Sequence, residues 1–411
     1  MLMNFKFAHI ADCHLDTYSR SNVLQNELNL SFSNAIESAI KNNVNFVLIC
    51  GDLFNNASPT LSTLVFAIEN LKKLKDRKIP VYAIAGSHDF MPSGHTILNV
   101  LNAADLTINA YNPVNEENAE LNLIQHRDTN IYIGGIIGRI RGLDRQLYDQ
   151  IKIRPKENAF NIFMFHNGIE EFKPKIMKNT EFLPLSCLPK GFNYYAAGHI
   201  HEFFETKINE GKSTLLFPGS PYPTNIGDFG QQNRNQYVLV EVRDNNIYTK
   251  RIRTYEHDFV VLNIEMKKAK INEIEAKLDN LVKNTDFSNK VVILKVKAKI
   301  EDGKAGDVNI SEVEDKIMKR GALVVEKNLS GLTSGTILKT RFDKGSSARE
   351  IEERIAGENT GIVKIDGMDA EKEKKIILEL INVLKISKKP GQTNAVYEDE
   401  FVASCRKIFD V

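Results

Sequence analysis

The chain has 411 residues, of which 42% are apolar and 26% are charged, with 54 Lys and Arg against 53 Asp and Glu. This composition excludes a disordered chain, and the length exceeds what one hydrophobic core usually serves, so we expect a large domain followed by smaller ones. The net charge of +1 neither favours nor excludes a nucleic-acid ligand, because acidic faces can offset a basic groove.

The first residues lead directly into a strand pattern, without the basic flank and cleavage site of a signal peptide. No apolar run is long enough to span a bilayer. The four cysteines are widely scattered and include no C-x-x-C pair, which is the usage of a reduced protein without a disulfide framework. We therefore expect a cytoplasmic protein that makes no membrane contact.

Residues 1–257 alternate short, β-rich apolar runs with helical patterns, which is typical of an α/β sheet protein. Apolar residues at helical spacing predict a helix over residues 61–74. Near the end of this region, residues 236–252 predict a β-hairpin with its turn at residues 244–246. We expect these residues to form one large domain.

Residues 258–343 predict a strand, a helix, a strand, a helix and two further strands. In the strand over 291–300, apolar residues alternate with Lys295, Lys297 and Lys299. One face of this strand is therefore expected to be buried, while the other is solvated or contacts an acidic group. We expect a small α/β domain without catalytic residues.

Residues 344–411 predict a linker followed by two amphipathic helices on either side of Pro390 and Gly391. Two such helices barely bury their own apolar faces, so the surface of a partner protein is the expected cover. Docking on their own chain is the alternative. The candidate partner-binding residues are Ile377, Leu380, Leu384, Phe401, Cys405 and Ile408.

Five of the nine histidines and two aspartates come directly after predicted strands, which is where open α/β sheets place their ligand sites. Together these positions indicate a metal site, whereas each remaining histidine is expected to be an ordinary hydrogen-bonded residue. The strand-end residues are Asp12, His14, Asp52, His88, His166, His199 and His201. The remaining histidines are His9, His95, His126 and His257.

Imidazoles mixed with carboxylates, without a converging thiolate, suit manganese, iron or zinc rather than a structural zinc cage. A strand-end carboxylate such as Asp52 can bridge two ions. Two ions roughly 3.5 to 4 Å apart activate water and stabilise an in-line displacement at phosphorus. The residue types therefore predict metal-assisted hydrolysis of a phosphoester.

The motifs D-x-H, G-D, G-S-H-D, a single H and G-H-x-H follow one another along residues 12–201. This set resembles the calcineurin-like metallophosphoesterase superfamily. The segments "ADCHLD", "GDLF", "GHIH" and "FPGSPYPTN" are similar to those of the Mre-eleven-type nucleases of archaeal double-strand-break repair, which are related to bacterial SbcD. The resemblance implies a four-layer β-sandwich flanked by helices over 1–257, a capping domain over 258–343, and a helix-loop-helix within 344–411 that binds a Rad-fifty-type ABC ATPase.

The resemblance also implies two Mn²⁺ ions in each subunit. The first ion would be bound by Asp12, His14, Asp52 and His201. The second would share Asp52 and be bound by Ser87, His166 and His199. His88 would stabilise the transition state or protonate the leaving oxygen, and Asp89 would orient the His88 ring.

The activity implied by the resemblance is a 3′-to-5′ exonuclease on duplex DNA ends and an endonuclease on single strands and hairpins. The implied assembly is a homodimer within a heterotetramer that contains the ATPase. Residues 61–74 and 94–105 are the candidate dimerisation helices by position.

Three positions depart from the family pattern. Ser87 stands where the family usually has Asn, and because a hydroxyl is a poorer ligand than an amide oxygen, we expect the second ion to bind more weakly, directly or through a water held by Ser87. Asn55 stands where many relatives have His, which puts in doubt any substrate contact of that side chain. Asp16 replaces a common Gly, and we assign it no role.

The sequence indicates the DNA-contacting residues less clearly than the metal ligands. Arg139 and Arg141 belong to a basic segment, 139–156, that either lines a path for phosphates or is a solvated face. The loop over 219–225 either presents Tyr222, Thr224 and Asn225 to the substrate or packs as a tight turn.

The leading hypothesis is a manganese-dependent DNA nuclease subunit. A phosphoesterase for a small molecule or a phosphoprotein is the first alternative, because the core motifs are shared across the superfamily. A catalytically weak DNA-binding scaffold is the second, because Ser87 departs from the pattern. The additional small domain and the two C-terminal helices favour the nuclease, since a small-substrate hydrolase has no need of them.

Overall fold

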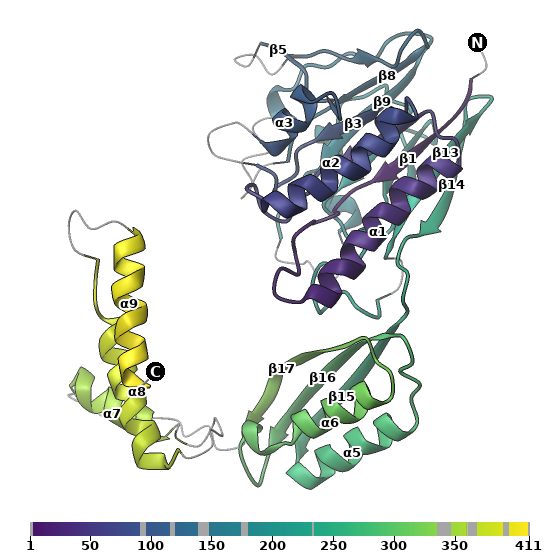
Figure 1. Ribbon diagram of the computed structural model, residues 1–411. Helices are drawn as coiled ribbons and strands as arrows, with labels where there is room; N and C mark the ends of the chain where they lie inside the picture. The colour runs from purple at the N-terminus through teal and green to yellow at the C-terminus, as the bar shows by residue number, and fades with distance from the viewer. Residues whose placement is uncertain are drawn as a thin grey trace. The chain divides into compact units, whose positions relative to one another are not determined.

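The computed structural model describes residues 3–90, 96–115, 120–138, 148–173, 180–231, 234–334, 347–358, 360, 368–388 and 394–409 (Figure 1). The chain divides into an N-terminal unit, residues 1–260 with 289–291, and a C-terminal unit, residues 261–288 with 292–411. The boundary expected between residues 343 and 344 lies outside the described residues. Among the helices of the described part, none has the length and apolar content needed to cross a membrane.

The first sheet of the N-terminal unit has six strands in the order β14-β13-β1-β2-β3-β4. Strands β1 to β4 are parallel to one another, and β13 pairs antiparallel with both β1 and β14. The hairpin predicted over 236–252 is confirmed as β13–β14. The strands are β1 (Asn4–Ile10), β2 (Phe46–Cys50), β3 (Val81–Ile84), β4 (Ile108–Asn109), β13 (Gln236–Arg243) and β14 (Asn246–Arg253).

The second sheet of this unit also has six strands, in the order β11-β12-β10-β9-β8-β7. Its central strands β8, β9, β10 and β12 are parallel, and β7 and β11 are antiparallel edge strands. The strands are β7 (Ile124–Gln125), β8 (Ile131–Gly135), β9 (Phe160–His166), β10 (Tyr194–Gly198), β11 (Phe204–Ile208) and β12 (Ser213–Phe217). A separate two-stranded sheet consists of β5 (Pro113–Asn115) and β6 (Glu120–Leu121).

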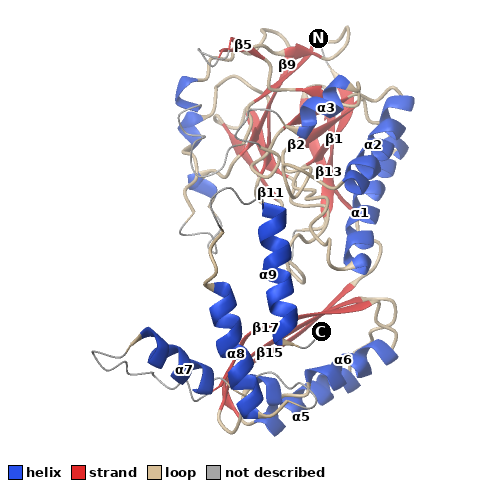
Figure 2. Cartoon of the chain, turned by 60° about the vertical axis from the view of Figure 1, so that its left-hand side comes forward, coloured by secondary structure: helices blue, strands red, loops and turns tan. Residues whose placement is uncertain are grey.

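The two large sheets face each other across an apolar core that includes Phe7, Phe46, Ile162 and Tyr194. Three helices pack on the outer face of the first sheet, and Figures 1 and 2 both show two of them, α1 and α2, side by side there. These helices are α1 (Asn22–Lys41), α2 (Leu61–Asp76) and α3 (Ile97–Ala103). The expected α/β architecture and the helix expected over 61–74 are confirmed. This packing places the ends of β1, β2 and β3 against those of β9 and β10.

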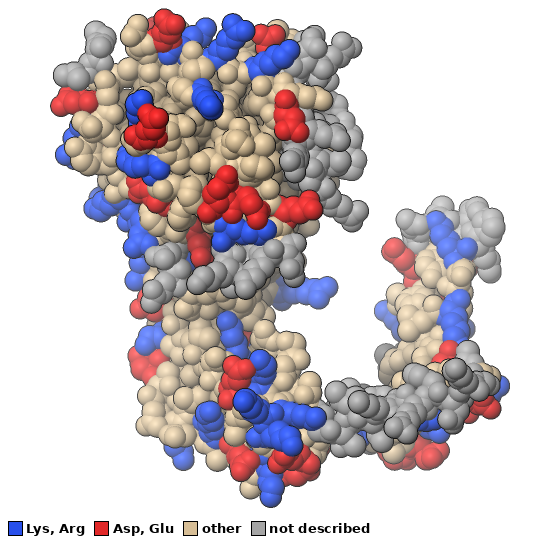
Figure 3. Space-filling view, turned by 180° about the vertical axis from the view of Figure 1, so that it is seen from behind, with Lys and Arg blue, Asp and Glu red and all other residues tan. Residues whose placement is uncertain are grey.

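The C-terminal unit begins with a three-stranded sheet in the order β15-β16-β17 and two helices. The alternation predicted in 291–300 is confirmed, because Leu294, Val296 and Ala298 are buried while the lysines between them are more exposed. Lys297 forms an ion pair with Glu265 of the neighbouring strand, and acidic and basic side chains are interspersed on this unit (Figure 3). The elements are β15 (Phe259–Ala269), α5 (Ile271–Lys283), β16 (Val291–Ile300), α6 (Ile310–Lys319) and β17 (Val324–Ser334).

Three further helices follow in the chain, and α8 packs against both of the others. They are α7 (Ala348–Glu358), α8 (Ala370–Leu384) and α9 (Asn394–Ile408). The N-terminus of α8 is capped by Asp369, whose carboxylate accepts a hydrogen bond from the backbone N–H of Lys372.

Candidate metal centre

Every predicted metal ligand lies at or just beyond the carboxyl end of a strand. Asp12 and His14 follow β1, Asp52 follows β2, and Ser87 follows β3. His166 is the last residue of β9, and His199 and His201 follow β10. Because the two sheets pack face to face, these strand ends bring ligands from both sheets into one cluster.

The backbone at the cluster adopts conformations that non-glycine residues rarely adopt. Four of the predicted ligands have φ in the left-handed region: 54° at Asp12, 46° at His14, 50° at Asp52 and 84° at His199. Hydrogen bonds hold the backbone there, since Asp12 N donates to Gly51 O at 3.1 Å and His14 N donates to Asp52 O at 2.9 Å. Backbone strain of this kind is typical of functional sites.

Glycine is required at two of these strand ends. A Cβ atom on Gly51 would lie 2.1 Å from Nδ1 of His166, and one on Gly198 would lie 2.0 Å from the carbonyl oxygen of Cys50. Gly51 also has φ of 86°. The two glycines therefore let β2, β9 and β10 approach closely enough for their ligands to meet.

The ligand atoms form overlapping groups around two shared carboxylates. Nε2 of His166 lies 3.1 Å from Oδ2 of Asp52, and Nε2 of His14 lies 3.6 Å from the same oxygen. Nε2 of His201 lies 3.9 Å from Oδ1 of Asp12. Three sets have ligand atoms all within 4.8 Å of one another: Asp12–His14–His201, Asp12–Asp52–His166 and His14–Asp52–His88.

Buried polar atoms without hydrogen-bond partners point to a bound cation. Within the described residues, both ring nitrogens of His14 and Nε2 of His166 have no hydrogen-bond partner. Nδ1 of His166 donates to Cys50 O at 2.8 Å, so Nε2 is the ring nitrogen left to bind a metal ion, which would displace the proton there. Asp12 and Asp52 are buried beside these nitrogens, and buried carboxylates require a compensating positive charge. The donor set therefore fits a divalent metal.

The electrostatics of the cluster are those of an anionic cavity. Burial alone would lower the pKa of His166, but the Asp52 carboxylate and then Asp12 raise this pKa to about 10. Burial raises the pKa of Asp12. Burial lowers the pKa of His14 and of His199 to about 3, so both imidazoles are neutral at physiological pH, as ligation requires.

Ser87 and His199, the two remaining predicted ligands, lie beside Asp52, Asp12 and His166. Oγ of Ser87 donates to Oδ2 of Asp52 at 3.3 Å. The backbone N–H of His199 donates to both carboxylate oxygens of Asp12 at 3.0 Å, and its ring lies 5.4 Å from the ring of His166. The structure thus brings all seven predicted ligands to one place.

His88 is exposed beside this cluster, and the residue that orients its ring is not the expected one. The expectation that Asp89 orients the His88 ring is wrong: Nδ1 of His88 donates to the carbonyl oxygen of Asn55 at 2.8 Å. The buried Asp89 carboxylate instead accepts backbone N–H bonds from Gly86, Leu53 and Phe54. These hydrogen bonds use both carboxylate oxygens of Asp89, which thereby connects the loop after β3 to the loop after β2.

Two residues that sequence reasoning missed hold His201 in place. Nδ1 of His201 lies 3.5 Å from Oδ2 of Asp228, and Oδ1 of Asp228 lies 2.8 Å from Nη1 of Arg234. Arg234 also pairs with Glu202 at 3.1 Å. No motif spacing marks Asp228 or Arg234, because Asp228 reaches His201, and Arg234 reaches Asp228, only through the folding of the loop after β12.

The loop over 219–225 supports the metal ligands rather than facing outward as a unit. Oγ1 of Thr224 lies 3.0 Å from Nδ1 of His201, and Asn225 donates to the carboxylate of Asp228 at 2.9 Å. Tyr222 is fully buried among aromatic rings that include Phe229 and Phe259. This residue therefore packs inside the protein and does not face a substrate. Arg139 and Arg141, the other candidate substrate contacts, lie outside the described residues.

Three of the histidines expected to be ordinary residues are hydrogen-bonded away from the cluster. His9 lies 2.9 Å from the Tyr194 hydroxyl, His126 lies 3.0 Å from that of Tyr82, and His257 pairs with Glu27 at 2.8 Å. Those expectations are confirmed. His95 lies outside the described residues.

Comparison with known proteins agrees with this geometry. Residues 5–203 match the calcineurin-like phosphoesterase family, so this part of the chain is a calcineurin-like metallophosphoesterase domain, a class that uses divalent metal ions.

Archaeal proteins named DNA double-strand break repair protein Mre11 are homologues of the chain. The one from Saccharolobus solfataricus is 34% identical over 218 residues, which are 52% of this chain and 53% of that protein, so the match spans about half of its length. The one from Methanocaldococcus jannaschii is 28% identical and covers 78% of this chain and 82% of that protein. A solved structure, a dimetal phosphatase from Danio rerio, is 12% identical, with a TM-score of 0.36 over 61% of this chain and 99% of that one.

Proposed function

We propose that the chain is a manganese-dependent DNA nuclease that acts within the cell in double-strand-break repair. The observation that carries the proposal is the cluster at the strand ends, in which two carboxylates and the imidazoles of His14 and His166 are buried and that of His201 is partly buried. The names printed for the archaeal homologues supply the substrate class. The proposed reactions are 3′-to-5′ exonuclease cleavage of duplex ends and endonuclease cleavage of single strands and hairpins.

The proposed centre holds two Mn²⁺ ions. Asp12, His14, Asp52 and His201 would bind the first, and Asp52, Ser87, His166 and His199 the second. Such ions supply Lewis-acid stabilisation of a phosphoryl group and lower the pKa of water. The hydrogen bond that Nδ1 of His166 donates to Cys50 O fixes the orientation of the His166 ring, and Thr224 with Asp228 fixes the ring of His201.

His88 is the proposed catalytic residue. Its Nδ1 is held by the carbonyl of Asn55 and its backbone N–H donates to Oδ1 of Asp52 at 2.8 Å, so the ring has a fixed orientation next to the cluster. The ring itself is exposed, which leaves Nε2 accessible to a substrate. His88 is thus placed to protonate the leaving oxygen or to stabilise charge on the phosphate.

The proposed domains are 1–257 for catalysis, 258–343 as a capping domain and 344–411 for binding a Rad-fifty-type ABC ATPase. Exposed apolar side chains support the last assignment: Leu384 is 68% exposed, and Val396, Val402 and Phe409 are also exposed. The proposed contact residues Ile377, Leu380, Phe401, Cys405 and Ile408 are partly buried on the same two helices.

A homodimer within a heterotetramer is the proposed assembly. On α2, Leu61 is 81% exposed and Val65 is also exposed, and Val100 is exposed on α3. Exposed aliphatic residues on neighbouring helices are typical of a protein interface.

The test of the nuclease is an assay with labelled linear duplex, hairpin DNA and a chromogenic phosphomonoester, each with Mn²⁺, Mg²⁺ or a chelator. We expect Mn²⁺-dependent cleavage of both DNA substrates by the wild type and cleavage slower by about 10²-fold or more by His88→Ser. Cleavage of the phosphomonoester alone would replace the nuclease by a small-substrate phosphoesterase. No cleavage of any substrate would favour a DNA-binding scaffold.

The partner is tested by copurification of an ABC ATPase with the full chain and with a chain lacking residues 369–411. We expect the deletion to abolish the association while Mn²⁺-dependent cleavage of hairpin DNA persists. If the shortened chain still copurifies with the ATPase, the docking surface lies in another part of the chain.

A further inference from the structure

A small aromatic pocket of about 160 Å³ lies in the N-terminal unit, beside the metal-binding segment that follows β10. Most of its described lining residues are phenylalanines: Phe172, Phe182, Phe203, Phe204 and Phe217. They come from separate parts of the chain, including the 3₁₀ turn Glu170–Phe172 and the strands β11 and β12. Among the described lining residues, none is a predicted metal ligand, so the shape of the pocket does not require a bound ion.

The pocket and the metal centre share one short segment of backbone. Ile200 lines the pocket and stands between the predicted ligands His199 and His201. Phe182 also lines the pocket, and the centroid of its ring lies 6.1 Å from that of the His199 ring. Because one sugar separates the base of a nucleotide from its phosphate, a nucleotide whose phosphate lies at the metal centre has its base within reach of this pocket.

The rings differ in exposure. Phe172, Phe203 and Phe204 are partly exposed, whereas Phe182 and Phe217 are buried. A ligand can therefore enter past the partly exposed rings and pack against the buried ones. The rings of Phe172 and Phe204 lie 5.1 Å apart, so the partly exposed side is itself a packed aromatic surface.

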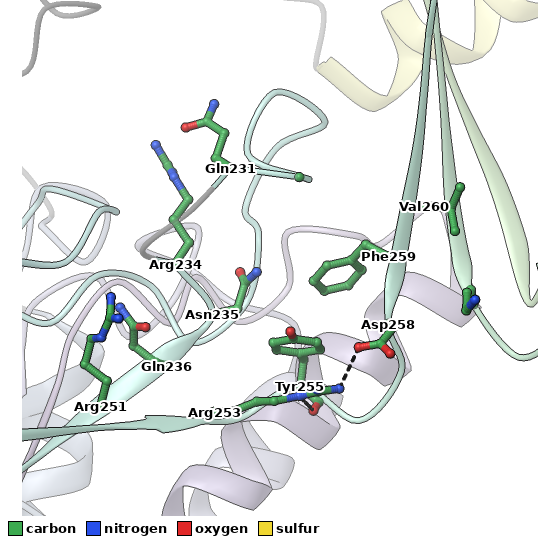
Figure 4. Close-up of a pocket in the computed structure, with 12 residues that line it drawn as sticks. Gln231, Arg234, Asn235, Gln236, Arg251, Arg253, Tyr255, Asp258, Phe259 and Val260 are labelled. Atoms are coloured by element: carbon green, nitrogen blue, oxygen red, sulfur yellow. Dashed lines mark hydrogen bonds and ion pairs between the residues drawn. The ribbon is translucent and has the colours of Figure 1, made fainter. Parts of the chain in front are cut away.

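The charge of the lining is compensated. Glu202 is the charged residue among the described lining residues, and its Oε1 lies 3.1 Å from Nη2 of Arg234. The guanidinium of Arg251 lies 5.0 Å from the centroid of the Phe203 ring. Both arginines line the larger open cavity drawn in Figure 4. Because the ion pair neutralises Glu202, a neutral ring is favoured over a phosphate as the occupant of the aromatic pocket.

The volume of the pocket suits one six-membered ring. An apolar cavity of about 150 Å³ in a protein binds a molecule of the size of benzene. A pyrimidine base has one such ring, whereas a purine has two fused rings. Proteins that bind single-stranded nucleic acid pack bases against aromatic side chains in the same way.

We propose that this pocket binds the base of a nucleotide next to the metal centre and favours a pyrimidine over a purine. The proposal rests on the proposed nuclease function, because it takes DNA as the substrate. The shared chemistry is a pyrimidine nucleotide, which either a DNA strand or a released nucleoside monophosphate supplies.

The test measures binding of a fluorescent oligothymidylate and of an oligodeoxyadenylate of equal length to the full chain, in the presence of a chelator. We expect Phe172→Ala and Phe203→Ala each to weaken oligothymidylate binding about tenfold, a typical loss for one base–aromatic contact. Binding of the oligodeoxyadenylate should fall less, so the ratio of the two affinities should decrease. Stacking within the adenylate strand is the same for every protein variant, so the change in this ratio reports the pocket.

The matched control is Phe66→Ala. Phe66 is partly buried on α2, and its ring lies tilted 6.2 Å from that of Phe32, much as the Phe172 ring lies tilted near that of Phe204, but Phe66 does not line the pocket. We expect this control to bind both oligonucleotides as the wild type does. An unchanged ratio in both pocket variants, or an equal change in the control, would overturn the proposal.

Thymidine monophosphate separates the two sources of the base. If the pocket variants lose affinity for the oligonucleotide alone, the occupant is a base of the strand; if they also lose affinity for thymidine monophosphate, the pocket accepts the released nucleotide as well. Either outcome supports the pocket. Because a chelator prevents metal-dependent cleavage, binding is measured independently of catalysis. A chain that cleaves no DNA but shows these losses would overturn the nuclease and keep the pocket, and a chain that cleaves DNA without these losses would do the opposite.

Discussion

Nε2 of His166 and Oδ2 of Asp52 lie 3.1 Å apart, with both side chains almost completely buried. The imidazole comes from the second sheet and the carboxylate from the first, so this contact joins the two halves of the N-terminal unit. A metal ion bound between them would therefore link the two sheets as well as build the site.

Mn²⁺ should stabilise the fold. At a free concentration about 100 times its dissociation constant, Mn²⁺ should raise the free energy of unfolding by about 2.7 kcal/mol, because it binds only the folded chain. Thermal unfolding with Mn²⁺ and with a chelator measures the difference. Asp52→Ala should abolish it, whereas Glu37→Gln, which changes an exposed carboxylate paired with Lys73, should keep it. An undiminished effect of Mn²⁺ in Asp52→Ala would place the ion elsewhere.

His88→Ala should lower the rate of DNA cleavage by about 10²- to 10⁴-fold, the usual contribution of a general acid or base. Affinity for Mn²⁺ should stay close to that of the wild type, because the ring is held by Asn55 rather than buried among the ligands. Isothermal titration of Mn²⁺ checks the second part. A large loss of Mn²⁺ affinity would make His88 a ligand, through the group that it forms with His14 and Asp52.

Ser87→Asn should tighten binding of the second Mn²⁺. The hydroxyl of Ser87 points to Oδ2 of Asp52, so it stands beside the shared carboxylate, and an amide oxygen is a better ligand than a neutral hydroxyl. Titration of Mn²⁺ followed by electron paramagnetic resonance separates the two binding steps. Ser87→Ala is the matched control and should not tighten the second step; equal affinity in wild type and Ser87→Asn would remove the idea.

The candidate ligands could be found from the sequence because each lies at or within a few residues of the end of an apolar strand, as His166 follows "NIFMF". Sheet geometry then guarantees that strand ends meet. The contacts of Asp89 and Asp228 could not be predicted in this way. Asp89 bonds the backbone of another loop, and Asp228 reaches His201 from a loop without periodic pattern, so both contacts depend on tertiary packing alone.

His9 and His126 should stay neutral in the folded chain at pH 5. Burial lowers the pKa of His9 to about 3 and that of His126 to about 4. The unfolded chain takes up these protons near pH 6.5, so the contribution of each histidine to stability is complete above that pH. It declines as the pH falls towards 3 for His9 and 4 for His126. NMR titration of the histidine rings, assigned with His9→Gln and His126→Gln, checks this; a midpoint near 6.5 for either ring would contradict it.

Asp228→Asn should weaken Mn²⁺ binding by about 10- to 100-fold, the usual cost of removing a carboxylate that supports a metal-binding histidine. Burial raises the pKa of Asp228, but the hydrogen bond with His201 and the charge of Arg234 lower it to about 2, so the residue is a carboxylate throughout the physiological range. The amide keeps the shape but loses the charge that holds the His201 ring.

The matched control for this prediction is Thr224→Val, which removes the hydroxyl contacts with His201 and with Asp228 and keeps the charge of the Asp228 carboxylate. We expect it to weaken Mn²⁺ binding less than Asp228→Asn does. Cleavage should be restored in Asp228→Asn by raising the Mn²⁺ concentration, because His88, the proposed catalytic residue, is unchanged and only the occupancy of the metal site is lost. A loss of cleavage that persists at saturating Mn²⁺, with unchanged Mn²⁺ affinity, would show that Asp228 supports the loop rather than the metal ligand.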